Sequence, residues 1–173
     1  MSGLNYDTQL SLIQRMVDKG DAYRTFVEFD IPANGSKYFS ISVGDKAVGF
    51  FSRLIVPDQP NIRYEVRTNA TINSYVGNPI PIRNLNGKSE NSSACVFREC
   101  TQTSLGELVD IDKLPGQAAS GSNASGQVYR DPDDLKINQN NKEYLLVLSN
   151  PNNVIADTLL YLKWFETPPN IWS

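Results

Sequence analysis

The sequence predicts an all-β protein, an antiparallel β-sandwich that is jelly-roll-like and carries one N-terminal α-helix. Three observations support this fold class. After residue 20, apolar residues alternate with polar ones through most of the chain, as they do in half-buried strands. Roughly eight such segments recur with turn residues between them. No helical segments alternate with these strands, which excludes a parallel βαβ sheet.

The helix is predicted at residues 8–19, where Asp7 can cap the N-terminus and Gly20 can close the C-terminus. Its apolar face can cover the end of the protein's own sheet or dock on a neighbouring subunit, and the sequence leaves both open. We therefore divide the chain into an N-terminal helical arm, residues 1–22, and a β-sandwich domain, residues 23–173. The apolar face consists of Leu10, Ile13, Met16 and Val17.

The segment FDIPANGSKYFSISVGDKAV, residues 29–48, holds alternating runs on both sides of a turn. Because Pro32, Asn34 and Gly35 favour tight turns, we predict a β-hairpin here. GNPIPIRNLN is too rich in proline for a central strand and is predicted to be an extended edge or a loop. The small residues at 115–127 predict a surface loop. Further strands are predicted at AVGFFSRLIV, IRYEVRT, ACVFRECT, GELVDI, EYLLVLSN and DTLLYLKWFE.

Composition narrows the classes of partner. The chain has 173 residues and a net charge of −3, and its lysines and arginines are scattered, so we expect no nucleic-acid partner. No apolar run approaches the roughly 20 residues that span a bilayer, so we expect no membrane partner. The start, MSGLNYDTQL, lacks a signal-peptide pattern, and we expect the protein to stay in the cytoplasm where it is made.

The residues that carry most enzyme chemistry are scarce. The chain contains no histidine, which removes Ser-His-Asp and Cys-His nucleophiles and the usual zinc sites. Cys95 and Cys100 fall on opposite faces of one predicted strand, so we expect two free thiols. We identify no cofactor, no metal site and no catalytic residue.

Acidic residues offer weak alternatives. The run RDPDDLK groups three aspartates but lacks the other features of a calcium loop, so we expect a solvated turn. A carboxylate pair for glycoside hydrolysis stays open, because its spacing is spatial. We expect the strand glutamates on solvent-facing positions. The residues concerned are Asp131, Asp133 and Asp134 in the run and Glu28, Glu65, Glu99 and Glu143 in the strands.

The C-terminal segment contains both tryptophans. Trp164 alternates within an apolar strand and is predicted to lie in the core. Trp172 follows the break TPP and is the better candidate for a contact with another molecule. We therefore predict that Ile171 and Trp172, together with the apolar face of the helix, contact other subunits.

Four segments follow one another along the chain: IPANGSKYFSISVGDKAVGFFSR, YEVRTNATI, GNPIPIRNLN and KEYLLVLSNPNNVIADTLLYLKWFE. In this order they resemble the small virion structural proteins of tailed bacteriophages, which include head decoration proteins. The resemblance implies a β-sandwich subunit without catalytic residues or a cofactor. Its partners would be the lattice of the major capsid protein and copies of itself, as a homotrimer. Its contact surface with them would be the terminal segments, which hold the residues predicted above, and one edge of the sandwich. It would be located in the virion, which is assembled in the host cytoplasm.

Two other functions remain open. A tail-fibre or tail-tip module that binds a host-surface glycan would use the same sandwich, with exposed aromatic rings beside carboxylates or amides at the loop end. A carbohydrate-active enzyme would need a cleft with two carboxylates of perturbed pKa.

Overall fold

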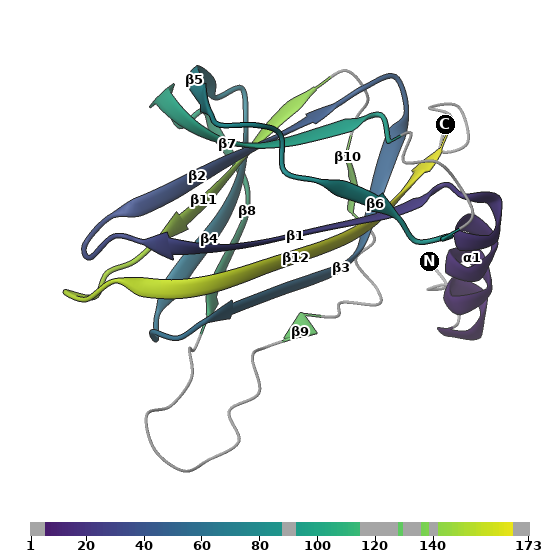
Figure 1. Cartoon of the computed structure of the whole chain (residues 1–173), viewed down its shortest axis with the longest axis horizontal. Coiled ribbons are helices and arrows are strands. Elements are labelled where there is room, and N and C mark those ends of the chain that lie inside the picture. Colours follow the sequence, from purple (N-terminus) through teal and green to yellow (C-terminus); the bar gives the residue numbers. More distant parts are fainter. Residues whose placement is uncertain (1–5, 88–92, 115–127, 130–135, 139–141, 168–173) are drawn as a thin grey trace, which may run out of the picture.

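A computed structural model of the chain describes residues 6–87, 93–114, 128–129, 136–138 and 142–167 (Figure 1). These residues form one helix, α1 (Tyr6–Lys19), and twelve strands. The strands are β1 (Ala22–Ile31), β2 (Ser36–Val43), β3 (Ala47–Pro57), β4 (Ile62–Thr68), β5 (Thr71–Val76), β6 (Ile82–Asn84), β7 (Cys95–Ser104), β8 (Glu107–Leu114), β9 (Val128–Tyr129), β10 (Lys136–Asn138), β11 (Glu143–Ser149) and β12 (Ala156–Thr167).

The strands form two antiparallel sheets that pack face to face (Figure 1). In sheet A the order is β10-β3-β12-β1-β6, and β9 also pairs with β3. In sheet B the order is β5-β7-β2-β11-β4-β8. The chain passes from one sheet to the other between β1, β2, β3 and β4, and again between β10, β11 and β12. This alternation is the arrangement of a jelly roll, and the predicted fold class is confirmed.

The predicted hairpin is wrong. β1 and β2 are not paired: β1 pairs with β12 and β6 in sheet A, whereas β2 pairs with β11 and β7 in sheet B. The turn between them therefore crosses from sheet to sheet. Phe29 of β1 and Phe39 of β2 meet across the sandwich, with ring centroids 4.8 Å apart. A period-two pattern fixes which face of a strand is apolar but not which strand lies beside it.

Aromatic rings from both sheets form the centre of the core. Phe39 also stacks on Phe97 of β7, with centroids 5.4 Å apart, and Tyr23 of β1 stacks on Trp164 of β12 at 6.2 Å. Such pairs each add about 0.5 to 1.5 kcal/mol beyond the burial of their area. Trp164 is only 2% exposed, so its predicted place in the core is confirmed.

The helix packs against its own sheet. Met16 is buried against Phe165 of β12, with Val17 beside it. Helix α1 ends at Gly20, whose φ of 81° and hydrogen bonds (Gly20 N to Val17 O, 3.0 Å; Asp21 N to Met16 O, 2.9 Å) form a Schellman cap. The C-terminal end of the helix is thus as predicted.

The start of the helix differs slightly from the prediction. Helix α1 begins at Tyr6, so Asp7 lies inside the helix instead of capping it from outside. Strand β1 begins at Ala22, one residue before the expected domain boundary.

The ring of Phe165, against which the helix packs, lies over Gly49 of β3. A Cβ atom at Gly49 would lie 2.4 Å from the Cζ of that ring, so only glycine leaves it enough space.

Most of the other strand predictions are confirmed, and β6 forms an edge of sheet A as expected of a proline-rich segment. Strand β5 was not predicted, because TINSYV is short and polar and five of its six residues are exposed. The predicted loop at residues 115–127 lies outside the described residues, as do the three aspartates of RDPDDLK.

Candidate functional site

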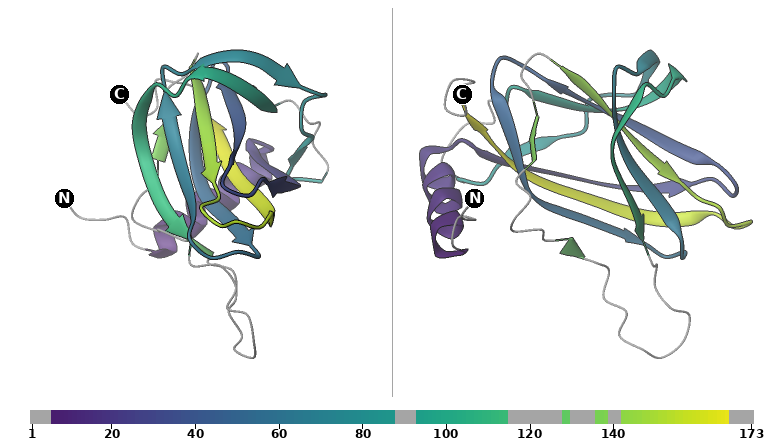
Figure 2. Two further views of the ribbon diagram at one scale, coloured as in Figure 1. Left: turned by 90° about the vertical axis from the view of Figure 1, so that its left-hand side faces the viewer. Right: turned by 180° about the vertical axis from the view of Figure 1, so that it is seen from behind.

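Sheet B curls until strands from its opposite edges come together at one end (Figure 2). Only Asn69 and Ala70 connect β4 to β5, although these strands lie near opposite edges of the sheet. Gly106, between β7 and β8, crosses directly over this connection: a Cβ atom at Gly106 would lie 2.2 Å from Thr68 O, and its φ is 66°. The outer face of sheet B is therefore concave and closed at this end.

A small apolar cluster fills the closed end of the concave face. Leu145 and Val147 of β11 point into it, while their neighbours Tyr144, Leu146 and Leu148 point into the main core. Strand β11 is thus buried on both faces, which explains why its sequence is a continuous apolar run. The cluster consists of Cys100, Leu145 and Val147, with Tyr38, Ala70 and Ile72 packed against them.

Polar side chains next to this cluster attach β5 to the sheet. The Oε1 atom of Glu143 accepts hydrogen bonds from Tyr75 Oη (2.7 Å), Ser40 Oγ (2.8 Å) and Ser42 Oγ (3.1 Å). The bond to Glu143 raises the pKa of the Tyr75 hydroxyl. Arg98 lies over the Tyr75 ring at 5.1 Å. The tyrosine stays protonated, because its proton is donated to Glu143. These polar side chains therefore hold β5 against the sheet rather than supplying a nucleophile.

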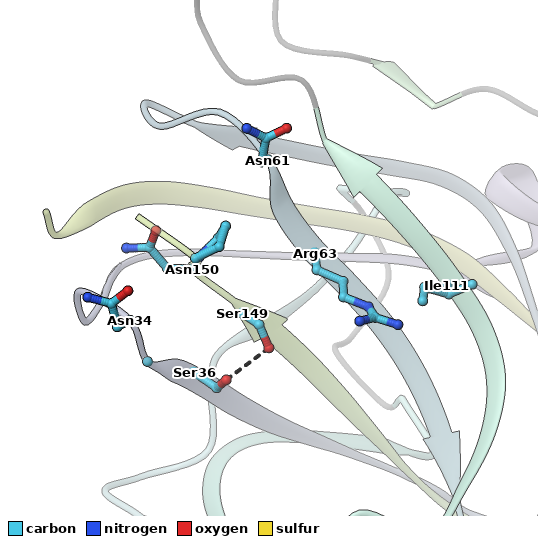
Figure 3. Close-up of a pocket in the computed structure, with 9 residues that line it drawn as sticks. Asn34, Ser36, Asn61, Arg63, Ile111, Ser149 and Asn150 are labelled. Carbon is cyan, nitrogen blue, oxygen red and sulfur yellow. Dashed lines mark hydrogen bonds between the residues drawn. The ribbon is translucent and has the colours of Figure 1, made fainter. Parts of the chain in front are cut away.

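The other end of the concave face opens into a pocket of about 1070 Å³ beside the turns at the end of the sandwich (Figure 3). The Ser36 and Ser149 hydroxyls, from β2 and β11, are hydrogen-bonded at 2.8 Å on its floor. Among its described lining residues, Arg63 alone carries a charge. The lining consists of Asn34, Gly35, Ser36, Asn61, Arg63, Ile111, Ser149, Asn150 and Pro151.

Arg63 is held by a buried carboxylate. Glu65 of β4 binds Arg63 Nε at 2.8 Å through Oε1 and Arg67 Nε at 2.6 Å through Oε2. All three residues share the outer face of β4, because side chains two apart in a strand point the same way. Glu65 is only 6% exposed, so its predicted solvent-facing position is wrong. The curl of sheet B and the two flanking arginines account for its burial.

An apolar strip runs along the edge of sheet B. In the described part of the chain, β8 pairs only with β4, so its other side is an open edge. Leu108, Val109 and Ile111 of this strand are 48%, 54% and 44% exposed. Soluble proteins usually protect such edges with charges, prolines or short strands. Strand β8 carries the exposed Glu107 beside these side chains, whereas Asp110 is paired with Arg53. We call the three apolar residues the β8 strip.

A second buried carboxylate joins the two sheets. Glu166 at the end of β12 is 1% exposed and accepts hydrogen bonds from Ser93 Oγ (2.5 Å), Ala94 N (2.8 Å) and Trp164 Nε1 (3.1 Å). Lys46 Nζ lies 4.0 Å from its Oε2 atom. Both oxygens of this carboxylate accept hydrogen bonds from the protein, so its geometry is that of a structural group.

Both cysteines are buried free thiols, and Cys95 lies in the main core whereas Cys100 lies in the outer cluster. The predicted opposite orientation is confirmed. Burial is the main cause that raises the pKa of both thiols, and for Cys100 the value reaches about 11.

Alkylation should report this burial directly. At pH 8 we expect iodoacetamide to modify Cys100 about 100-fold more slowly in the folded protein than in urea. A pKa of about 11 instead of 9.0 lowers the thiolate fraction by that factor. Peptide mass spectrometry over a time course measures both rates. Equal rates in the two conditions would contradict the placement of Cys100 beneath Tyr38 and Ile72.

The structure describes only part of the predicted contact set. Met16 and Val17 pack inside the protein's own fold, and Ile13 is half-buried outside that cluster. Helix α1 contains Leu10, whose side chain lies outside the described part, as do Ile171 and Trp172. The pocket was not predicted, because its residues come from segments far apart in the chain. The β8 strip lies on the predicted strand GELVDI, but which strand forms the edge of a sheet follows from the strand pairing, which the sequence does not show.

Other site classes find no support in the described residues. There, no three acidic or cysteine side chains are grouped as metal ligands would be. No helix in the described part is long and apolar enough to cross a membrane. Comparison of the chain with models of protein families and with curated proteins finds no match.

Proposed function

We propose that the protein is a structural subunit of a bacteriophage virion, a head decoration protein that binds the assembled capsid lattice as a homotrimer and has no catalytic activity. The ordered resemblance of four segments to phage virion proteins supports this proposal. The jelly-roll sandwich is a fold that such a subunit can have, although many unrelated functions use the same architecture.

The observation that carries the proposal is the β8 strip. Three exposed apolar side chains lie on a strand edge that is open in the described part of the chain, and such a surface favours association with another chain. A subunit that is covered by its neighbours in a particle can retain such an edge. We therefore assign the β8 strip as the main contact with the capsid or with other copies.

Selective binding gives this contact a function. A protein that binds only the assembled shell stabilises that shell by mass action, because free capsid subunits offer no equivalent site. Many weak contacts repeated over the lattice then raise the resistance of the particle to internal pressure.

The test uses purified protein and capsid shells that lack it. We expect sedimentation to show saturable binding of many copies per shell and a higher melting temperature of the shell. Leu108→Lys and Val109→Lys should each reduce binding at least about tenfold, since each places a charge in a dehydrated contact. Ile155→Lys is the matched control, because Ile155 is 59% exposed in the β11–β12 turn, away from the edge.

Two results would reject this proposal. Shells that bind no protein would point to the tail, where glycan arrays are the next experiment. Loss of binding with Ile155→Lys but not with the β8 variants would reject the assigned surface. The described lining of the pocket contains no pair of carboxylates, so no observation here favours a glycoside hydrolase.

A further inference from the structure

We infer that the pocket at the open end of the concave face binds a sugar unit that carries a carboxylate. The arrangement of Arg63, Asn34 and Asn61 around the Ser36–Ser149 pair carries this inference. It concerns a surface distinct from the contact proposed above, apart from Ile111, which borders both.

Arg63 supplies the charge recognition. Glu65 engages its Nε atom and is itself held by Arg67, so the guanidinium is oriented before any ligand arrives. The terminal nitrogens of Arg63 have no partner among the described residues, and its side chain is 55% exposed. Two parallel N–H donors match the two oxygens of a carboxylate. A group prepared in this way loses little freedom on binding.

The charge balance of the pocket favours an anion. The whole chain carries a net charge of −3, yet the described lining includes one arginine and no carboxylate. Glu65 lies next to the pocket, but its two oxygens are already paired with Arg63 and Arg67. An anionic ligand would therefore meet a locally positive surface.

Two asparagines at the rim supply groups for sugar hydroxyls. Asn34 and Asn61 adopt left-handed backbone conformations, with φ of 50° and 61°, at the ends of two turns. Both are exposed, and their side-chain amides make no hydrogen bond within the described residues. An amide offers both donors and an acceptor, as recognition of a hydroxyl group requires. Asn150, by contrast, already uses its amide: it bonds Val154 and Asn152 within its own turn and Ile31 at the end of β1.

The floor and one wall complete the surface. The Ser36 and Ser149 hydroxyls bond each other, which leaves one of their two protons for a ligand. Ile111 and Pro151 are exposed and offer apolar surface to the C–H face of a ring. The volume of about 1070 Å³ is at the upper end of ordinary ligand pockets and accommodates more than one sugar unit. A compact anion alone would leave the asparagines unused.

The test is a titration of the intact protein followed by ¹H–¹⁵N NMR. The probes are trigalacturonic acid, the neutral galactose trimer, N-acetylneuraminic acid and sodium acetate. We expect trigalacturonic acid to shift the signals of Asn34, Asn61 and Arg63 and to bind at least about tenfold more tightly than the neutral trimer. If N-acetylneuraminic acid binds and trigalacturonic acid does not, the carboxylate that the pocket recognises belongs to a sialic acid rather than to a uronic acid. Acetate should leave the asparagine signals unchanged.

Variants separate binding from folding. Arg63→Gln should weaken binding of the acidic sugar about tenfold, whereas Arg24→Gln removes an equal charge from an exposed site on sheet A and should not. Asn34→Gly and Asn61→Gly keep the left-handed backbone and remove only the amide, so they should weaken binding at unchanged thermal stability. If the Arg63→Gln variant does not fold, these two asparagine variants still test whether the pocket binds the acidic sugar.

The inference is overturned if neutral and acidic trimers bind equally, if acetate reproduces all the shifts, or if Arg24→Gln weakens binding as much as Arg63→Gln. It is also overturned if no probe shifts the pocket signals. Binding to capsid shells by the Arg63→Gln variant should equal that of the unmodified protein, so the outcome for the pocket is independent of the decoration role.

Discussion

Replacing Glu166 with alanine is expected to lower the free energy of unfolding by about 3 to 5 kcal/mol. The carboxylate is 1% exposed and accepts three hydrogen bonds, from Ser93, Ala94 and Trp164. Its removal leaves buried donors without an acceptor, and each such donor costs about 1 to 3 kcal/mol. It also leaves Lys46 without its nearby negative charge.

Urea unfolding followed by tryptophan fluorescence measures this loss. Glu166→Gln is the sharper variant, because it keeps the shape but turns one acceptor into a donor. It must lose either the bond from Ala94 N to Oε2 or those from Ser93 and Trp164 to Oε1. We expect it to be less stable than the native chain and more stable than Glu166→Ala. Glu28→Ala, at an exposed position, should change little. An alanine variant at residue 166 as stable as this control would contradict the structural role.

The positions of most strands could be predicted from the sequence, because most strands are apolar at every second residue and β11 is a continuous apolar run. Their pairing could not. PANGS contains all the residues of a hairpin turn, yet here it carries the chain between sheets. The turn is held from outside, by bonds from Asn34 N to Asn152 O and from Asn150 N to Gly35 O. A turn that depends on a segment more than a hundred residues away leaves no local signal.

The burial of the two carboxylates likewise could not be predicted from the sequence. Glu65 alternates with Tyr64 and Val66, so in an isolated sheet it would face solvent. Glu166 instead lies on the same face of β12 as Leu162 and Trp164, where an acidic residue is not expected from its charge. Burial of Glu65 follows from the curl of sheet B, and burial of Glu166 follows from Ser93, 73 residues earlier in the chain. Both depend on tertiary contacts. Charges separated by two residues, as in RYEVR, are the one available hint, since Arg63 and Arg67 must share the face of Glu65.

The pocket was equally inaccessible from the sequence. Asn34, Asn61, Ile111 and Ser149 come from four separate elements that meet only once sheet B is formed. Asparagine in a turn is first an indication of left-handed backbone, and the φ angles of Asn34 and Asn61 bear this out. That both residues also line a common pocket is a property of the curled sheet, not of either turn.

Replacing Asn150 with aspartate is the other substitution expected to have a large effect, about 3 to 5 kcal/mol of unfolding free energy at pH 7. Asn150 is 2% exposed, and its Nδ2 donates to three carbonyls, those of Ile31 (3.2 Å), Pro32 (3.2 Å) and Val154 (2.7 Å). A carboxylate there would face three carbonyl oxygens with no proton to share, away from water. The loss should shrink as the pH falls, because protonation of the buried acid removes the charge and restores one donor.

Urea unfolding at pH 7 and pH 4 measures both parts of this expectation. Asn153→Asp is the matched control, since Asn153 is exposed in the same turn and should tolerate the charge. Asn150 also lines the pocket, and its bonds to Ile31 and Pro32 fix the turn that holds Asn34. A stable Asn150→Asp protein would therefore mean that this turn is not held as described, and the pocket built on it would lose its support.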